Sequence, residues 1–236
     1  MLLGPDSMLK LASGRVAIFG LGGVGSWCAE ALCRCGVGHL TLIDEDTVSL
    51  TNLNRQAEAT ELTLGMPKTE ALAQRLLSIN PELDAELLQS RYEASSRDMF
   101  LSPGRYDYIV DAIDLVACKL DLIQSAMNMG LPIISALGTG NKTDAARLSI
   151  TDISKTSGCP FARVIRKELK ARGITHHTVV YSPEKALTPL KTEEPPPGRR
   201  SVPGSLMWVP ASAGLLLAQH VVLELCGEYM NKQERE

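Results

Sequence analysis

RVAIFGLGGVGSWCAEAL, residues 15–32, decides the fold of this chain. A short apolar run leads into a glycine-rich turn and then a helical pattern, and Gly20, Gly22 and Gly25 match the fingerprint G-x-G-x-x-G. The first glycine permits a tight bend, the second lets the backbone approach a phosphate, and the third lets the helix pack on the strand. The helix directs its N-terminal N–H groups at the anion. The stretch predicts a nucleotide site but does not choose between NAD and ATP.

Strand and helix patterns alternate on the C-terminal side of this turn. Apolar runs predict strands at 15–20, 39–44, 84–89, 106–112 and 132–136, and helical patterns lie at 24–35, 67–79 and 116–129. Nearly continuous apolar strands that alternate with helices indicate a parallel sheet covered on both faces. We therefore expect an α/β fold with a Rossmann-like, doubly wound, mostly parallel sheet.

The second half continues this pattern in a less regular way. We expect a strand at 147–154, a helix at 160–173 and a strand at 179–182, as a C-terminal α/β extension that continues the sheet. Residues 183–203 are rich in proline and predict a crossover or lid, because proline suits neither a helix interior nor a central strand. An apolar helix at 210–226 follows. We expect an ATP-binding region over 1–150 and an extension over 151–236, integrated into one domain.

Composition narrows the class of protein. A formal charge of −3 argues against nucleic-acid binding by bulk electrostatics, although a local basic patch remains compatible with it. The cysteines form no C-x-x-C pair, which argues against a zinc ribbon or a thioredoxin-type site. Cys28, Cys33 and Cys35 share one predicted helix and are interpreted as reduced core thiols, as expected in a reducing cytoplasm.

Two segments bear on targeting. The N-terminus MLLGPDSMLKLASG lacks a basic region followed by a long apolar region, so we expect no signal peptide. The apolar stretch 206–226 is nearly long enough to span a membrane, but Gln219, His220 and Glu224 interrupt it. We interpret it as a helix buried in the core or at a subunit interface, and we expect no membrane partner.

Charged residues that follow the turn in the sequence favour a triphosphate that takes part in a reaction over a bound dinucleotide. Asp44 ends the second strand, where a carboxylate can accept from ribose hydroxyls. TNLNRQ supplies Asn52 and Arg55, and GMPK places Lys68 in the first turn of a helix, where a cation is unfavourable unless an anion lies nearby. Two positive charges suit a triphosphate whose α-phosphate and leaving pyrophosphate gain charge. Each residue alone could instead be an exposed salt-bridging side chain.

Carboxylates also end the fourth predicted strand. Asp111 and Asp114 lie in VDAIDLVACK, at the edge of the sheet where ligands bind. A carboxylate there can hold Mg²⁺ against phosphates, since Mg²⁺ is usually bound by one or two carboxylates together with substrate oxygens. The alternative is that Asp114 only caps the next helix.

The glycine turn, Asp44, TNLNRQ, GMPK and D-x-x-D stand in one order at one spacing. Over roughly residues 9–150 they resemble the ubiquitin-activating-type (ThiF/MoeB-like) adenylyltransferases, which include the adenylating enzymes of molybdopterin and thiamine biosynthesis. The resemblance implies a homodimer that binds ATP and Mg²⁺. It implies that the turn, with Gly23, lies against ATP, that Asp44 holds the ribose, and that Asn52 and Arg55 contact phosphates. It also implies that Lys68 neutralises the α-phosphate and that Asp114 holds Mg²⁺, so Arg55, Lys68 and Asp114 are the expected catalytic residues.

Within this family the second half, ITDISKTSGCPFARVIRKELKARG and PGSLMWVPASAGLLLAQHVV, resembles a tRNA-modifying subgroup. These enzymes adenylate the carboxylate of threonylcarbamoyladenosine in tRNA and cyclise it with loss of AMP, and sulfur-trafficking proteins are sometimes linked to them. The family generally carries an arginine upstream of the LLG stretch that reaches an ATP site. The first arginine here is Arg15, so we expect that segment to be missing or another residue to take this role.

A basic stripe supports an RNA partner. Arg163, Arg166, Lys167 and Lys170 stand at i, i+3, i+4 and i+7 of one predicted helix, which suits contacts with tRNA phosphates. Nearby candidates are Arg172, His176, His177, Arg199 and Arg200. The alternative is an ordinary solvated helix face.

Two other functions remain open on the sequence. One is an adenylyltransferase that activates the C-terminal glycine of a small sulfur-carrier or ubiquitin-like protein. The other is an NAD-dependent dehydrogenase, or a nucleotide-sensing module without chemistry.

Overall fold

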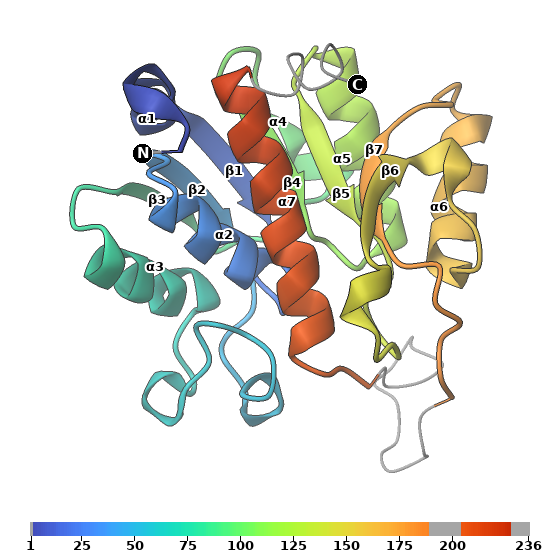
Figure 1. Ribbon diagram of the computed structural model, residues 1–236, viewed down its shortest axis with the longest axis horizontal. Helices are drawn as coiled ribbons and strands as arrows, with labels where there is room; N and C mark the ends of the chain where they lie inside the picture. Colours follow the sequence, from blue (N-terminus) through green and yellow to red (C-terminus); the bar gives the residue numbers. More distant parts are fainter. Residues whose placement is uncertain (1, 189–203, 228–236) are drawn as a thin grey trace.

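A seven-stranded sheet forms the centre of the fold in the computed structural model, which describes residues 2–188 and 204–227 (Figure 1). The strands are β1 Arg15–Phe19, β2 His39–Ile43, β3 Asp84–Leu88, β4 Tyr108–Asp111, β5 Ile133–Ala136, β6 Ser149–Asp152 and β7 Thr178–Tyr181. The helices are α1 Gly4–Ser13, α2 Gly25–Arg34, α3 Lys68–Ile79, α4 Arg97–Phe100, α5 Val116–Asn128, α6 Pro160–Ala171 and α7 Trp208–Cys226.

The strand order is β3-β2-β1-β4-β5-β7-β6. The first six strands in this order pair in parallel, and only β6 at the edge is antiparallel to its neighbour β7. The chain therefore runs outward from β1 in one direction through β2 and β3, and in the other through β4 and β5. Ligands of open α/β sheets bind beyond the carboxyl ends of the strands where the order reverses, which here is between β1 and β4. The expected doubly wound sheet and its C-terminal extension are confirmed.

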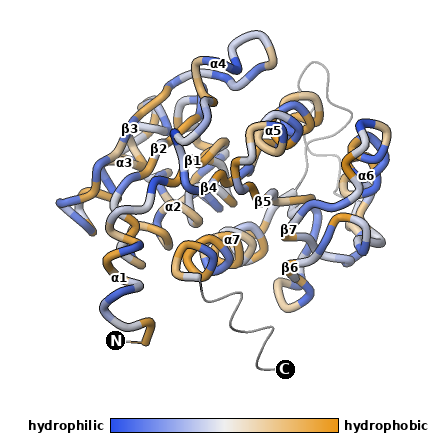
Figure 2. Tube along the Cα trace, turned by 90° about the horizontal axis from the view of Figure 1, so that it is seen from above, coloured by the Kyte–Doolittle hydropathy of each residue, from blue (hydrophilic) through white to orange (hydrophobic). Residues whose placement is uncertain are grey.

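Helices cover both faces of the sheet (Figure 2). On one face α2, α3 and α7 contribute to an apolar cluster that includes Leu32, Leu72 and Leu217. On the other face α4, α5 and α6 contribute to a second cluster that includes Phe100, Ile123 and Ile165. The strands between them are apolar on both sides, which explains the continuous apolar runs in the sequence.

Close approaches of backbone to backbone require glycine at several positions, of which Gly25 and Gly214 bear on the site. A Cβ on Gly25 would lie 1.8 Å from the carbonyl oxygen of Gly20, so only glycine lets α2 start directly on the turn after β1. A Cβ on Gly214 of α7 would lie 2.4 Å from the carbonyl oxygen of Val24. The first contact fixes the turn that the fingerprint predicts, and the second seats α7 beside the start of α2.

The apolar C-terminal helix is accounted for by tertiary packing. Within the described part of the chain, α7 has the length and apolar composition of a membrane span, but 61% of its most apolar window is buried in the fold. It packs along α2 and also contacts α1 and the C-terminal strands (Figure 1). The helix begins at Trp208, two residues before the expected start, with Pro210 in its first turn.

Several sequence expectations need correction. Helices α1 and α4 were not anticipated, and β3 is a half-exposed edge strand because only β2 pairs with it. Cys35 is exposed at the C-terminal cap of α2, so the interpretation as a core thiol is wrong for this residue, whereas Cys28 and Cys33 are buried. Most of the expected crossover, with Arg199 and Arg200, lies outside the described residues.

Candidate active site

A cavity of about 800 Å³ opens where the strand order reverses, beyond the carboxyl ends of β1, β2, β4 and β5. Its lining brings together segments that lie far apart in the chain: the glycine turn, the ends of β2 and β4, the TNLNRQ loop, the start of α3 and the loop after β5. Of the residues expected to bind a nucleotide it includes Gly20, Gly22, Gly23, Asp44, Asn52, Arg55, Lys68 and Asp114. Gly25 is not in the lining, since it supports the turn against Gly20.

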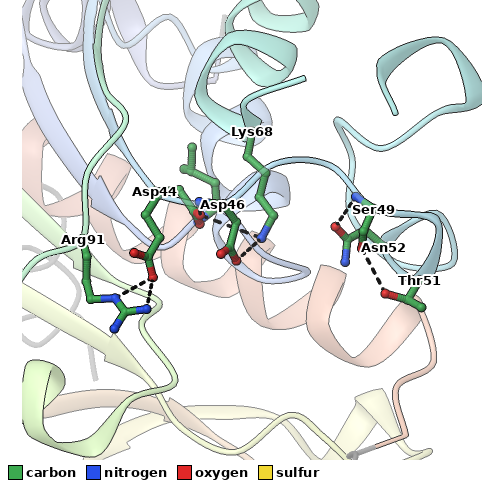
Figure 3. Close-up of polar contacts among 9 residues, drawn as sticks. Asp44, Asp46, Ser49, Thr51, Asn52, Lys68 and Arg91 are labelled. Atoms are coloured by element: carbon green, nitrogen blue, oxygen red, sulfur yellow. Dashed lines mark hydrogen bonds and ion pairs between the residues drawn. The ribbon is translucent and has the colours of Figure 1, made fainter. Parts of the chain in front are cut away.

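Lys68 and Asp44 form the charged centre of the cavity (Figure 3). The Lys68 Nζ lies 2.9 Å from Asp46 Oδ2 and 3.8 Å from Asp44 Oδ1, and its side chain is only 7% exposed. Asp44 Oδ2 accepts from the backbone N–H of Leu21 at 2.7 Å, which ties the end of β2 to the glycine turn. Burial raises the pKa of Asp44, and the neighbouring Lys68 ammonium opposes that shift. A buried ammonium at a helix N-terminus is thus balanced by two neighbouring carboxylates.

The TNLNRQ loop places Arg55 over the glycine turn. A Cβ on Gly23 would lie 3.2 Å from Arg55 Cγ, so a glycine here lets the arginine stem pack on the turn. Arg55 Nη1 donates to the carbonyl oxygens of Thr51 and of the Asn54 side chain. Asn52 Oδ1 accepts from the N–H of Ser49 at 2.9 Å and shapes the loop. Contact of Asn52 with a phosphate would therefore come from its amide nitrogen.

The two carboxylates of the D-x-x-D motif have different surroundings. Asp114 lines the cavity. Asp111 is fully buried, and its Oδ2 accepts from Lys119 Nζ at 2.7 Å and from Ser135 Oγ at 2.6 Å. Asp111 Oδ1 accepts from the N–H of Ile113 at 3.1 Å, within the turn that leads to Asp114. Asp111 therefore organises the turn, and Asp114 is the carboxylate of the motif that lines the cavity.

The buried network extends from Asp111 into the C-terminal extension. Ser135 Oγ lies 2.7 Å from His177 Nε2, and because the hydroxyl donates to Asp111 the imidazole nitrogen donates to the hydroxyl. Burial lowers the pKa of His177 to about 3, so it is neutral at pH 7. The expectation that His177 joins the basic surface stripe is wrong, since this residue lies in the core.

Glu58 lies buried behind the charged centre, two residues after the TNLNRQ loop. Neither of its carboxylate oxygens has a hydrogen-bond partner within the described residues. Burial raises its pKa to about 7, and the Lys68 charge opposes part of that rise. Sequence reasoning missed Glu58 because a charged residue in a loop is normally exposed.

Other lining residues were also missed. They are contributed by the segment after β3, by the loop after β5 and by the residues just before α7, and include Ser90, Arg91, Tyr92, Gly138, Thr139, Gly140, Gly204 and Ser205. Arg91 pairs with Glu45, which follows the end of β2. Position in the sequence could have identified two of these lining residues, because Ser90 and Gly138 each closely follow a parallel strand, at the edge of the sheet where ligands bind.

The basic helix α6 lines a second cavity of about 670 Å³, separate from the first. Arg163, Arg166, Lys167 and Lys170 all contribute to it, together with His176 from the loop before β7. Arg166 Nη1 donates to the backbone carbonyl and to the hydroxyl of Thr156, so this arginine is anchored whereas Lys167 and Lys170 are exposed. The predicted stripe is thus one continuous surface feature.

Comparisons with known proteins agree with this arrangement. The tRNA threonylcarbamoyladenosine dehydratase of Bacillus subtilis (strain 168) is 35% identical over 245 residues, which cover 100% of this chain and 96% of that protein. A crystal structure of the Escherichia coli tRNA N6-threonylcarbamoyladenosine dehydratase in complex with ATP superposes with a TM-score of 0.85 at 32% identity, covering 100% of this chain and 93% of that one. The molybdopterin-synthase adenylyltransferase of Haemophilus influenzae is 35% identical over 130 residues, 55% of this chain and 53% of that protein.

A family model described as the ThiF family matches residues 1–235. The match spans the glycine turn, the TNLNRQ loop and the cavity between them, as well as the C-terminal extension. This chain therefore belongs to the ThiF family.

Proposed function

We propose that this chain is an ATP-dependent tRNA-modifying enzyme. It adenylates the carboxylate of threonylcarbamoyladenosine in tRNA and cyclises the product with loss of AMP, a net dehydration. The observation that carries the proposal is the meeting of the glycine turn, Asp44, Arg55, Lys68 and Asp114 in one cavity. A dehydratase of this kind from Bacillus subtilis also matches over the full length of the chain.

The reaction needs charge neutralisation and positioning more than a protein nucleophile. The substrate carboxylate attacks the α-phosphate, an oxygen–phosphorus bond forms, and pyrophosphate leaves. An atom of the same modified nucleoside then attacks the activated carbonyl, and AMP leaves with the carboxylate oxygen. We assign to Lys68 and Arg55 the neutralisation of the negative charge that builds on the phosphates, because both are cations that line the cavity beside the anion-binding glycine turn. Asp44 holds the ribose, and the glycine turn with Asn52 holds the phosphates.

Asp114 is the residue that would hold Mg²⁺ together with the phosphates. No group of three or more His, Cys, Asp or Glu side chains suited to a metal occurs among residues 2–188 and 204–227. One carboxylate beside a triphosphate site fits Mg²⁺, which keeps several waters and takes its remaining ligands from phosphates. When bound, the ion would neutralise charge on the phosphate oxygens.

The α6 stripe is the proposed tRNA contact. Arg163, Arg166, Lys167 and Lys170 converge on one cavity, and such a cluster suits backbone phosphates. Lys167→Glu with Lys170→Glu tests it, since both side chains are exposed and neither carries the anchoring bonds of Arg166. We expect the KM for tRNA to rise at least tenfold while ATP affinity stays unchanged. An unchanged KM would instead show that the basic face of α6 is an ordinary solvated helix face.

A second function, adenylation of the C-terminal glycine of a small carrier protein, is supported by the shorter match to the molybdopterin-synthase adenylyltransferase. That match covers only about half of either chain, whereas the match to the tRNA-modifying relative covers all of this one. We therefore rank it behind the tRNA substrate.

Further parts of the proposal concern assembly and location. We propose a homodimer, two structural regions (1–150 and 151–236) integrated into one domain, a cytoplasmic location, and interaction with sulfur-trafficking proteins. The family resemblance supports the dimer and the sulfur partners, and the tRNA-modifying relatives support the location.

Two experiments test the main proposal. Calorimetric titration is expected to show binding of Mg·ATP and no binding of NAD, and the reverse would refute the nucleotide assignment. Mass spectrometry of tRNA nucleosides from a strain that lacks the gene is expected to show loss of the cyclic form. Its persistence would refute the dehydratase assignment and favour the carrier-protein alternative.

A further inference from the structure

Asn141, in the loop after β5, is the one non-glycine residue with a left-handed backbone among residues 2–188 and 204–227. Its φ is 59°, a conformation that asparagine tolerates better than most residues but that still costs energy. Such a conformation persists where the surrounding contacts impose it, and it is concentrated at functional sites. The contacts that impose it here are therefore informative.

Both backbone groups and the side chain of Asn141 are used to join two other segments. Its N–H donates to the carbonyl of Gly204 at 2.8 Å, and its Oδ1 accepts from the N–H of Gly204 at 2.6 Å. Its carbonyl accepts from the N–H of Leu187 at 2.7 Å. Asn141 thus ties together the chain on either side of residues 189–203.

The residues that follow Asn141 are held to the same two segments. Lys142 Nζ donates to the carbonyl of Ser182 at 2.7 Å, and the Glu184 carboxylate accepts from the N–H groups of Thr143 and Asp144 at 3.0 Å each. The indole N–H of Trp208 donates to the carbonyl of Thr143 at 2.8 Å. The loop is therefore over-determined, as a strained residue requires.

These contacts build one wall of the cavity. The three residues that precede Asn141 line the cavity: Gly138, Thr139 and Gly140. The cavity is also lined by Gly204, which is bonded to Asn141, and by the next residue, Ser205. The carbonyl of Ser205 also accepts from Asn54 Nδ2 at 3.0 Å, next to Arg55. The wall that Asn141 fixes thus continues directly into the loop that carries a proposed phosphate ligand.

The wall offers the cavity a surface beside the residues assigned to the nucleotide. The glycine turn and Asp44 account for the phosphates and ribose of the nucleotide. An attack on the α-phosphate proceeds in line with the leaving pyrophosphate, so the attacking carboxylate needs a surface of its own beside that phosphate. The segments 138–140 and 204–205 also line the cavity, and none of their residues is assigned to the nucleotide.

We propose that Asn141 is a positioning residue that holds this wall in place for the acceptor carboxylate. The inference rests on the proposed function for the identity of the acceptor. The clamp itself, the bond between Asn141 Oδ1 and the Gly204 N–H, rests on geometry alone.

Two substitutions separate the clamp from the backbone conformation. Asn141→Gly keeps the left-handed backbone and removes the Oδ1 acceptor, whereas Asn141→Asp keeps an acceptor oxygen and a residue that tolerates positive φ. Asn80→Gly is a matched control, because Asn80 Oδ1 accepts from the N–H of Glu82 before β3, at the other end of the sheet.

For N141G we expect ATP affinity within about twofold of wild type and a loss of about 100-fold in kcat/KM with modified tRNA, the scale expected when reactants are misplaced by about 1 Å. N141D and N80G are expected to retain most activity. Unchanged kinetics in N141G, or an equal loss in N141D, would overturn the positioning role.

Hydrogen exchange gives a readout that does not depend on the substrate. The Gly204 amide is expected to exchange faster in N141G than in N141D or N80G, and equal exchange in all three would overturn the clamp. If wild type converts no tRNA, the proposed function fails, while the exchange comparison still decides whether Asn141 clamps this wall.

Discussion

Replacing Lys119 with methionine is expected to destabilise this protein strongly, although the residue does not line the active-site cavity. The ion pair between Lys119 Nζ and Asp111 Oδ2 spans 2.7 Å, and both side chains are 0% exposed. Burial lowers the pKa of Lys119, and the neighbouring Asp111 carboxylate opposes that shift. In Lys119→Met a buried carboxylate would lose its counter-charge.

The size of the loss follows from this burial. Removing one partner of a buried pair costs about 3–5 kcal/mol, because the remaining charge is left without compensation. For a chain of this size about 1 kcal/mol shifts the melting temperature by roughly 2–4 °C, so we expect a drop of roughly 6–20 °C. The exposed pair between Arg15 and Asp107 is the control, and Arg15→Ala should lower the melting temperature far less.

The double variant Lys119→Met with Asp111→Asn identifies the cause. The amide can still accept from Ile113 and pair with the Ser135 hydroxyl, so no buried charge remains and we expect most of the lost stability to return. Thermal and urea unfolding of the four proteins in a double-variant cycle measures the coupling. Two results would refute the reasoning: a loss below about 1 kcal/mol in Lys119→Met, or a double variant as unstable as the sum of the single ones.

The remaining predictions concern the cavity. Lys68→Ala should lower the rate of AMP formation about 100- to 1000-fold, the usual cost of removing one preorganised charge from a transition state, and near-wild-type turnover would remove Lys68 from the site. Asp114→Asn should raise the Mg²⁺ concentration needed for half-maximal activity, measured by titration at fixed ATP, whereas an unchanged Mg²⁺ dependence would refute a role of Asp114 in holding the ion. Burial raises the pKa of Glu58 to about 7 from its usual 4.5, so the folded state binds a proton that the unfolded state has lost between these values. Stability should therefore fall as the pH rises from about 4.5 through 7. Glu58→Gln should flatten that slope in urea unfolding at several pH values, and an identical slope in both proteins would show that Glu58 titrates normally.

Local sequence predicted most of the framework because its signals are periodic and short-ranged. The glycine spacing after residues 15–19, the apolar runs of β2 and β4, and the alternation with helices all follow from backbone geometry within a few residues. The same reasoning failed where exposure depends on distant segments. Cys35 follows the apolar pattern of α2 and yet is exposed, because its helix ends there.

The sequence also predicted the residue types of the site, because they occur in motifs that follow one another along the chain. Asp44, Arg55, Lys68 and Asp114 come from motifs whose chemistry suits a triphosphate, and all four line the cavity. Their roles remain predictions until the variants above are measured. The wall at Gly138–Gly140 and Gly204–Ser205 escaped notice, since its two halves are more than sixty residues apart in sequence and are joined by tertiary contacts such as the Asn141 bonds.

The sequence by itself determined the doubly wound framework, the nucleotide-binding turn and the charged residues around it, because these depend on local periodicity and on side-chain chemistry. Only the tertiary structure decided which carboxylate of D-x-x-D faces the cavity and which is buried against Lys119. It alone showed that His177 belongs to the core and that Glu58 is buried. Burial and partnership are set by segments that are distant in the chain, and no local pattern of residues encodes them.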